Sequence, residues 1–180
     1  MTSHNRPADR LIDMPSGVRA SRARIPPFAT VLEEHGRVLL RFCISQAGPD
    51  RGDDVFQETM ISALRAYDTL KDPGAVRAWL FSIAARKAID SHRAAARAPV
   101  PVEDVEIGTG GDPALEVGGE IWKDVARLPE KQRQAVGLRF IADLSHQEIA
   151  AVMGTSEAAA RRNVFEGVRR LREDLTDAVR

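Results

Sequence analysis

Residues 128–172 read LPEKQRQAVGLRFIADLSHQEIAAVMGTSEAAARRNVFEGVRRLR, and their order of residue types predicts three helices in succession. The first helix begins at Leu128-Pro129, because proline suits the first helical position and Glu130 then lies in the positive first turn. Its apolar residues recur at helical spacing: Ala135, Val136, Leu138 and Ile141. The stretch therefore begins with a helix that buries one face.

The rest of the stretch predicts a helix-turn-helix unit. Ser145, followed three residues later by Glu148, matches a capping box, and Gly154 matches a helix C-cap, so the second helix is short. Thr155-Ser156 then caps a third helix at once. The apolar residues of the third helix again recur at helical spacing: Val164, Val168, Leu171 and Leu175. Two helices joined by a tight turn that contains glycine form a helix-turn-helix.

The other side of the third helix is basic near its start. Arg161 and Arg162 lie there beside Asn163, and in the major groove arginine pairs with guanine and asparagine with adenine. The small side chains of Ala158 and Ala159 allow this end of the helix to enter the groove. The alternative is a solvated basic face that complements the negative end of the helix dipole. The turn, the caps and the small side chains together favour DNA binding.

Composition limits the classes of protein. The chain has 180 residues, of which 43% are hydrophobic and 29% charged, as is typical of a soluble globular protein. Lys+Arg and Asp+Glu both number 26, so no overall positive field attracts the chain to nucleic acid and any DNA contact must be local. The single cysteine, Cys43, excludes an internal disulfide. Since no apolar run reaches membrane-spanning length and no secretory signal is visible, we expect a cytoplasmic protein without membrane contact.

Shifts in composition divide the chain into four parts. Residues 1–27 carry arginines among Pro, Ser and Gly and are expected to be disordered. Residues 28–97 predict a first helical domain, and residues 120–180 predict a second that contains the helix-turn-helix. Residues 98–119, with prolines, a glycine cluster and acids, predict a flexible acidic linker. The expected fold is therefore all-α, with two small helical domains.

The first domain is expected to contain three amphipathic helices: Phe28 to Ala47, Asp53-Asp54 to about Tyr67, and Ala75 to Ala96. The second of these should bury, on one side, Phe56, Met60, Ala63, Leu64 and Tyr67. Its opposite side shows Asp54, Gln57, Glu58 and Arg65. On the third helix, charged residues at steps of four, three and four form one line: Arg86, Asp90, Arg93 and Arg97. Periodicity alone favours ion pairs around Asp90 for this line.

No arrangement typical of an enzyme is visible. His35 and Cys43 have no partners at metal-ligand spacing, and a thiol between Phe42 and Ile44 is typical of a core. The sequence also lacks a carboxylate pair, a phosphate-binding glycine loop and a nucleophile with its base. We therefore expect no catalysis, no cofactor and no metal.

Several short motifs stand in one order along the chain. Before the linker they are a DxxQET-type run, Asp54, Gln57, Glu58 and Thr59, and a helix start, Arg77-Ala78-Trp79-Leu80, followed by Ile83, Ala84, Ile89-Asp90 and Arg93. After the linker they are Leu128-Pro129, Ser145 to Ala150 and Gly154 to Ser156. From about Phe28 to its end, the chain resembles sigma-70 family sigma factors of the extracytoplasmic-function (ECF) type. Their region 2 corresponds to the first domain and their region 4 to the second.

The resemblance implies a subunit that gives bacterial RNA polymerase its promoter specificity. It implies docking on the clamp helices of the largest polymerase subunit by Asp54, Gln57, Glu58 and Arg65. For the minus-10 element, it implies capture of a flipped base and backbone contacts by Leu70, Lys71, Asp72, Arg77, Arg86, Lys87, Asp90 and Arg93. For the minus-35 element, it implies readout by Ser156, Glu157, Ala158, Arg161, Arg162, Asn163 and Phe165. The second domain would also pack on the flap of the second-largest subunit, and an anti-sigma partner is left open.

Three departures from the family pattern leave the promoter sequence open. Ala85-Arg86 stands where the family commonly has Arg-Asn. In the recognition helix, Ala159-Ala160-Arg161-Arg162-Asn163 stands where the family usually has Thr-Val-Lys-Ser-Arg, and Glu166-Gly167 stands where it has Arg-Ala. Gly167 costs about 1 kcal/mol relative to alanine inside a helix and is expected to loosen the helix end.

Two alternatives to a sigma factor also stay open. A stand-alone helix-turn-helix regulator would bind duplex DNA without polymerase. A helical protein-interaction module without DNA contact would make Arg161 and Arg162 dispensable.

Overall fold

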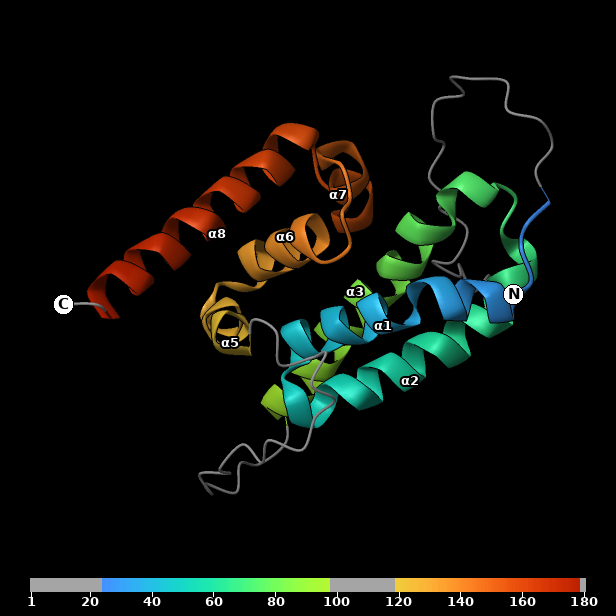
Figure 1. The fold of residues 1–180 in the computed structure, drawn as a ribbon, viewed down its shortest axis with the longest axis horizontal. Helices are drawn as coiled ribbons and strands as arrows, with labels where there is room; N and C mark the ends of the chain where they lie inside the picture. The colour runs from blue at the N-terminus through green and yellow to red at the C-terminus, as the bar shows by residue number, and fades with distance from the viewer. Residues whose placement is uncertain (1–23, 98–118, 179–180) are drawn as a thin grey trace, which may run out of the picture.

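A computed structural model describes residues 24–97 and 119–178 of the chain, and the regular secondary structure in these ranges is helical (Figure 1). In chain order, the elements are α1 (Phe28–Ala47), α2 (Pro49–Ala66), the short 3-10 helices η2 (Tyr67–Thr69) and η3 (Pro73–Ala75), α3 (Val76–Arg97), α5 (Gly119–Arg127), α6 (Glu130–Phe140), α7 (His146–Met153) and α8 (Glu157–Ala178). No strand occurs in the described ranges, which confirms the expected all-α class. The expected tail, residues 1–27, and the expected linker, residues 98–119, lie almost entirely outside the described residues.

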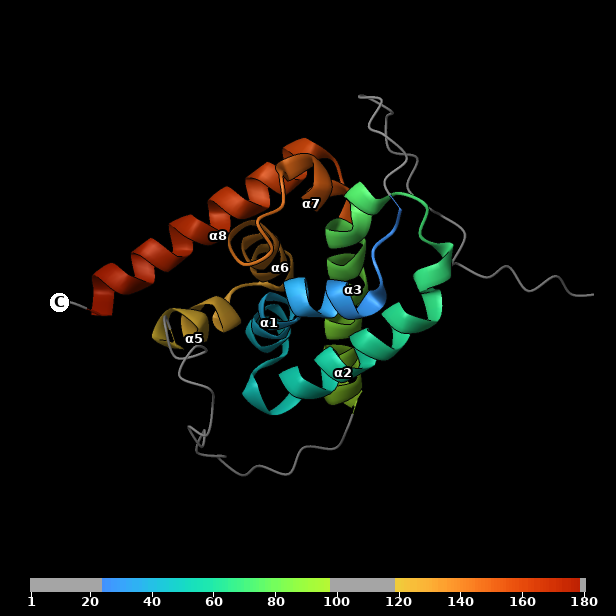
Figure 2. The same cartoon turned by 45° about the vertical axis from the view of Figure 1, so that its right-hand side comes forward.

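The helices form two neighbouring groups. Helices α1, α2 and α3 pack on one another, and α6, α7 and α8 form the second group with α5 at its side. Figure 2 shows α6 and α7 beside α1 and α3, while the far end of α8 extends away from the rest. Helix α6 therefore lies between α1 and α8, with contacts to both.

The corner between α1 and α2 differs from the sequence prediction. Helix α2 begins at Pro49 instead of Asp53, because Gly48 turns the chain at a φ of 84° and proline then takes the first helical position. Gly52 permits the tight corner, since a Cβ there would lie 2.6 Å from the Ile44 Cα atom. Helix α1 ends at Ala47, as predicted, and α2 follows it after the single residue Gly48.

The buried side of α2 was predicted correctly in part. Ala63 is buried, and Phe56, Met60 and Tyr67 are partly buried against the core, but Leu64 is 59% exposed. The side that faces the other helices is centred on Val55, Thr59 and Ala63, and Leu64 lies one step around the helix from it. Burial of Leu64 was a wrong prediction.

One continuous apolar core joins the two groups of helices. Leu39 and Phe42 of α1 and Phe81 of α3 belong to the same buried cluster as Leu138 of α6 and Ile149 of α7. The Phe42 and Phe81 rings meet edge to face, with centroids 5.3 Å apart, which is a favourable aromatic geometry. The first and second groups are therefore packed together as one body in this structure.

The thiol of Cys43 is part of this core. The residue is 0% exposed, and burial raises the pKa of the thiol to about 12. Because thiolate is the reactive form, Cys43 is an inert core residue at neutral pH.

Gly167 has a packing role that the sequence did not indicate. It is buried where α8 crosses α6, and a Cβ at this position would lie 2.6 Å from the Val136 Cγ2 atom. A side chain of any size would force the two helices apart. Glycine here permits close contact between α8 and α6, and the loosened helix end stays a prediction.

We expect Gly167→Ala to destabilise the protein although alanine is the better helix former. Overpacking costs about 1–3 kcal/mol, which outweighs the gain of about 1 kcal/mol in helix propensity. Urea unfolding measures the difference in the free energy of unfolding, with exposed Arg170→Ala on the same helix as the control. A more stable Gly167→Ala protein would contradict the close packing of α6 and α8.

Candidate nucleic-acid interface

The helix-turn-helix has the caps that the sequence predicts. The Ser145 Oγ atom accepts from the Glu148 N–H at 3.2 Å, and the Glu148 carboxylate accepts from the Ser145 N–H at 2.8 Å. Gly154 ends α7 in the left-handed region, at a φ of 62°. The Ser156 Oγ atom then accepts from the Ala159 N–H at 3.2 Å, which caps α8. All three local predictions are confirmed, because each depends on residues close together in the sequence.

Packing orients the first turns of α8. Ile149 and Ala150 of α7 are buried, as are Ala160 and Val164 of α8. These contacts leave one side of α8 open to solvent, with the exposed residues Glu157, Ala158, Arg161, Arg162 and Phe165. Phe165 is 68% exposed, which is unusual for an aromatic side chain without a partner. Asn163 is only partly exposed, because it lies nearer the buried side than its arginine neighbours.

The two arginines of this face differ in their surroundings. The Arg161 Nη2 atom lies 2.8 Å from the Glu157 carboxylate, one turn earlier on α8. Arg162 makes no ion pair with any residue that the structure describes. An exposed ion pair contributes about 0–1 kcal/mol, so a stronger ligand can replace Glu157 at Arg161.

A groove lined by apolar and basic side chains lies beside this face. It has a volume of about 460 Å³. Its apolar lining comes from Val164, Phe165 and Val168. Its basic lining comes from Arg161, Arg169 and Arg172 of α8 and from His146 at the start of α7. Basic groups near the start of α7 and along α8 are suited to phosphate oxygens on either side of a base-reading helix.

A second exposed face lies on α2. Asp54, Gln57, Glu58 and Arg65, which the sequence predicts on one side of the helix, are all exposed. Ile61 and Leu64 are 51% and 59% exposed and continue the same three- and four-residue spacing, so they share this face. The sequence analysis missed Ile61 and assigned Leu64 to the core. Counting in steps of three and four from Asp54 would have found both.

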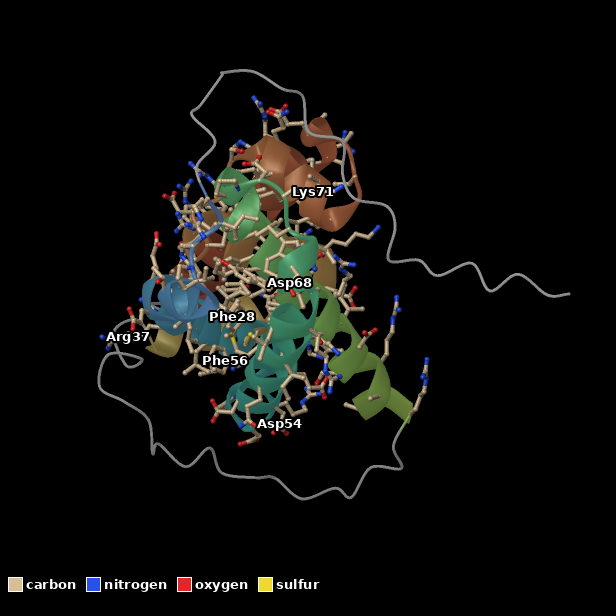
Figure 3. All side chains as sticks on the ribbon, turned by 90° about the vertical axis from the view of Figure 1, so that its right-hand side faces the viewer. Phe28, Arg37, Asp54, Phe56, Asp68 and Lys71 are labelled. Atoms are coloured by element: carbon tan, nitrogen blue, oxygen red, sulfur yellow. The ribbon has the colours of Figure 1, made fainter. Side chains whose placement is uncertain are left out.

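The loop between α2 and α3 is held by aromatic side chains. The rings of Phe28 and Tyr67 meet edge to face at 5.1 Å, and Tyr67 lies 6.0 Å from Trp79. The Tyr67 hydroxyl donates to the Pro26 carbonyl oxygen. This cluster fixes the end of α2. Figure 3 shows Asp54 near the beginning of α2, and Asp68 and Lys71 beyond its other end.

Of the three loop residues assigned to the minus-10 element, two are accessible. Leu70 is buried in the core, whereas Lys71 and Asp72 are exposed. The Asp72 Oδ1 atom accepts from the Gly74 N–H at 2.8 Å and thereby begins η3. Leu70 therefore anchors the loop, and its neighbours present their side chains to solvent.

The charged residues of α3 do not form the expected ion-pair ladder. Asp90 and Arg93 are exposed, and neither has an ion pair with another described residue. Arg86 instead donates to Ser82, from Nε to the carbonyl oxygen at 3.1 Å and from Nη2 to Oγ at 3.2 Å. The prediction of ion pairs around Asp90 is wrong, since the backbone and hydroxyl of Ser82 offer Arg86 closer partners.

Two residues assigned to different partners contact each other. The Lys87 Nζ atom of α3 lies 3.3 Å from the Glu58 carboxylate of α2. Arg77, at the start of α3, is half-buried, and its Nε atom has no hydrogen-bond partner among the described residues. No hydrogen bond or ion pair between described residues joins the α8 set to the sets on α2 and α3. The structure thus holds two separate groups of candidate contacts.

Neither a metal cluster nor a membrane-spanning helix occurs in the described ranges. No three of their His, Cys, Asp or Glu residues could together hold a metal ion. No helix in residues 24–97 and 119–178 is long and apolar enough to cross a membrane.

Two family models match the two helical groups. Residues 31–98 match the model of sigma-70 region 2, and residues 120–171 match that of sigma-70 region 4. The helix-turn-helix of α7 and α8 therefore belongs to a sigma-70 region 4. These matches define the class: the chain has the region order of a sigma-70 family sigma factor.

Known relatives narrow the class. The chain is 31% identical over 162 residues to the ECF RNA polymerase sigma factor SigD of Mycobacterium tuberculosis, a match that covers 82% of this chain and 76% of SigD. It is 32% identical over 143 residues to the ECF RNA polymerase sigma-E factor of Escherichia coli, over 70% of this chain and 72% of the relative. The chain belongs to the ECF family of sigma factors. Promoter recognition at the start of transcription is its function, and a stand-alone regulator is not favoured.

Solved structures share the fold. CnrH in complex with the cytosolic domain of CnrY superimposes with a TM-score of 0.63 at 27% identity, over 84% of this chain and 88% of CnrH. The sigma factor RpoE in complex with the anti-sigma factor NepR from Bartonella quintana gives a TM-score of 0.64 at 24% identity, over 82% and 97% of the two chains. The helical architecture described above is therefore that of known sigma factors.

We expect Ser145→Ala to weaken α7 and with it the placement of α8. Loss of an N-cap oxygen costs about 1 kcal/mol, and here both hydrogen bonds of the Ser145 hydroxyl are lost, while the Glu148 carboxylate can still accept from the backbone N–H of residue 145. Urea unfolding measures the loss in the free energy of unfolding. Thr155→Ala, in the next turn, is the control, because no hydrogen bond to the Thr155 side chain occurs among the described residues. Equal stability of Ser145→Ala and the wild type would contradict the capping box.

Proposed function

We propose that this sigma factor binds core RNA polymerase through α2 and reads promoter DNA with two separate sets of residues. In this proposal, residues 28–97 act as the region-2 domain and residues 120–180 as the region-4 domain, with residues 98–119 as the linker. The observation that carries the proposal is the capped helix-turn-helix, which presents two exposed arginines and an exposed Phe165 on one face.

The start of α8 reads the minus-35 element. Arg161 and Arg162 donate to base edges or phosphates, and Ala158 leaves room for the groove. Phe165 supports direct contact with a thymine methyl group, because its ring is open to solvent. Ser156, Glu157 and Asn163 complete this set, with Ser156 also capping the helix.

The loop after α2 and the outer side of α3 bind the minus-10 element. Capture of a flipped base must offset a few kcal/mol of lost stacking, and the exposed Lys71 and Asp72 can hydrogen-bond such a base. Leu70 anchors the loop, because its side chain is buried in the core. Backbone and single-strand contacts come from α3, through Arg77, Arg86, Lys87, Asp90 and Arg93.

The exposed face of α2 docks on the clamp helices of the largest polymerase subunit. Ile61 and Leu64 supply its apolar centre, and Asp54, Gln57 and Glu58 with Arg65 supply its polar edge. Interfaces of this kind concentrate binding energy in a few desolvated apolar side chains with a polar rim. The region-4 domain in turn packs on the flap of the second-largest subunit.

Three further features complete the proposal. An anti-sigma factor is a partner of this chain, supported by the similarity to CnrH, which was solved with the cytosolic domain of CnrY. The protein acts in the cytoplasm with the polymerase. It acts by binding alone, without a catalytic reaction or cofactor of its own.

The double variant Arg161→Ala/Arg162→Ala tests the reading face. We expect promoter-dependent initiation to fall by roughly tenfold or more, because each good base contact contributes about 1–3 kcal/mol of discrimination. Affinity for core polymerase should stay within a factor of about two, since Arg161 and Arg162 lie on α8 and the proposed docking face lies on α2. In-vitro transcription and a core-binding assay measure the two quantities, with Arg170→Ala as the control. Unchanged promoter output from the double variant would contradict the assignment.

The double variant Ile61→Ala/Leu64→Ala tests the docking face. Both side chains are exposed, so the fold should stay intact, while affinity for core polymerase should fall by roughly tenfold or more. Titration of labelled core polymerase measures the dissociation constant. Leu32→Ala, an exposed leucine on α1, is the matched control and should bind as the wild type does. Wild-type affinity in the double variant would place the docking site elsewhere.

A further inference from the structure

The chain enters the fold beside the loop between α2 and α3. The Tyr67 hydroxyl donates to the Pro26 carbonyl oxygen, and the Tyr67 ring meets Phe28 edge to face at 5.1 Å. Ile25 is partly buried and packs against the core. Figure 1 and Figure 2 show residues 24–27 next to this loop. The end of α2 therefore fixes the point at which the preceding residues join the fold.

That point lies near the residues proposed to hold the minus-10 element. Lys71 and Asp72 are exposed in the same loop. The Tyr67 ring, which lies beside the entering chain, is also 6.0 Å from the ring of Trp79, two residues after Arg77 at the start of α3. One aromatic cluster thus joins the entering chain, the loop and the beginning of α3.

The residues before this point differ in charge from the rest of the chain. Residues 1–24 contain five arginines, no lysine and two acidic residues, which gives a formal charge of +3. Because the whole chain has 26 basic and 26 acidic residues, residues 25–180 contain 21 basic and 24 acidic ones, a formal charge of −3. A polyanion that the rest of the chain repels can therefore attract this segment.

The positive charge is concentrated next to the fold. Arg19, Arg22 and Arg24 fall within six residues, and no acidic residue occurs between Asp13 and Glu33. Arg24 is exposed, whereas Arg19 and Arg22 lie outside the described residues. A chain spans at most about 3.4 Å per residue, so Arg19 lies within about 17 Å of Arg24. One DNA strand carries a phosphate every ~3.4 Å of helix axis, so several phosphates of DNA bound at the loop fall within this reach.

The composition of the segment favours DNA over a protein partner. Residues 15–24 read PSGVRASRAR and contain no aromatic residue, leucine, isoleucine or methionine. Protein interfaces depend on large side chains packed in pockets, whereas binding to phosphates needs only positive charge. The segment offers charge and lacks large apolar anchors.

We infer that Arg19, Arg22 and Arg24 form a basic arm that binds the phosphate backbone of promoter DNA beside the minus-10 element. The inference rests on the proposed function, because it needs DNA at the loop after α2. Phosphate contacts position a protein on DNA without reading its sequence. The arm therefore increases the affinity for promoters and leaves their base preference unchanged.

The triple variant Arg19→Ala/Arg22→Ala/Arg24→Ala tests the arm in holoenzyme, formed from the full chain and core polymerase. Titration of a promoter fragment at several salt concentrations measures the affinity and its salt dependence. We expect the slope of log K against log salt to fall in magnitude by roughly two to three, because each phosphate contact contributes about 0.7–0.9. Promoter affinity should fall by roughly tenfold or more at low salt. Affinity for core polymerase should stay within a factor of about two.

Two further variants separate the arm from a general effect of charge. Arg19→Lys/Arg22→Lys/Arg24→Lys should keep the wild-type slope, because counterion release depends on charge and lysine also binds phosphate. Arg6→Ala/Arg10→Ala is the matched control, since it removes two arginines from the same segment at least nine residues before the arm. This control should also keep the wild-type slope.

A cleavage reagent on residue 22 locates the arm on the DNA. Arg22→Cys supplies the one accessible thiol, because Cys43 is the only native cysteine and is 0% exposed. An iron chelate attached to the new thiol produces hydroxyl radicals that cut the nearest DNA backbone. In the holoenzyme bound to a promoter, we expect cuts beside the minus-10 element and none at the minus-35 element.

Three results would overturn the inference. The first is a salt slope in the triple alanine variant that equals that of the wild type. The second is an equal loss of slope in the Arg6→Ala/Arg10→Ala control, which would show a general effect of charge. The third is cleavage of a polymerase subunit without cleavage of DNA, which would assign the arm to the polymerase. If the wild-type holoenzyme binds no promoter at all, the proposed function itself is contradicted.

Discussion

The structure depends on how closely α6 approaches its neighbours on two sides. Gly137 lets it touch α1, and Gly167 of α8 lets α8 touch it from the other side. Between these contacts α6 is buried along most of its length, including the polar side chains of Gln132 and Gln134. The Gln132 Nε2 atom donates to the Glu166 carboxylate at 3.2 Å and so helps to fix α8, while the Gln132 Oε1 atom has no hydrogen-bond partner among the described residues. A shift of α6 would move both the helix-turn-helix and the region-2 core.

Features that depend on neighbouring residues could be predicted from the sequence. The capping box of Ser145 and Glu148, the left-handed Gly154 and the Ser156 cap are local, and each is present. Features that depend on distant partners could not. The packing role of Gly167 follows from the crossing of α8 and α6, and no local pattern in the sequence indicates it.

The candidate site residues also divide into those that the local sequence predicts and those that it does not. Exposure of Arg161, Arg162 and Phe165 follows from the apolar period of α8, which is readable in the sequence. The assignment of residues around the α2–α3 loop came from the family resemblance, and the structure adds that Leu70 is buried while Lys71 is exposed. The aromatic cluster of Phe28 and Tyr67 with Trp79 could not be inferred, because its members come from three separate segments.

In the free protein, weak ion pairs hold the side chains of two candidate DNA-contacting residues in place. Glu157 holds Arg161 on α8, and Glu58 holds Lys87 across α2 and α3. Such pairs keep a basic side chain ordered at little energetic cost, and a phosphate or carboxylate of a partner can replace them. With equal numbers of acidic and basic residues, the chain does not attract nucleic acid as a whole, so selectivity depends on these local exchanges.

The burial of Cys43 limits the kinds of signal to which this protein can respond. Its thiol is the only one in the sequence, it is closed off from solvent, and it remains protonated at neutral pH. Peroxides and disulfide reagents react with accessible thiolates, and the folded protein presents none. Thiol chemistry therefore leaves the folded sigma factor unchanged, and a thiol-based signal that alters its promoter output must be received by another molecule and delivered through binding.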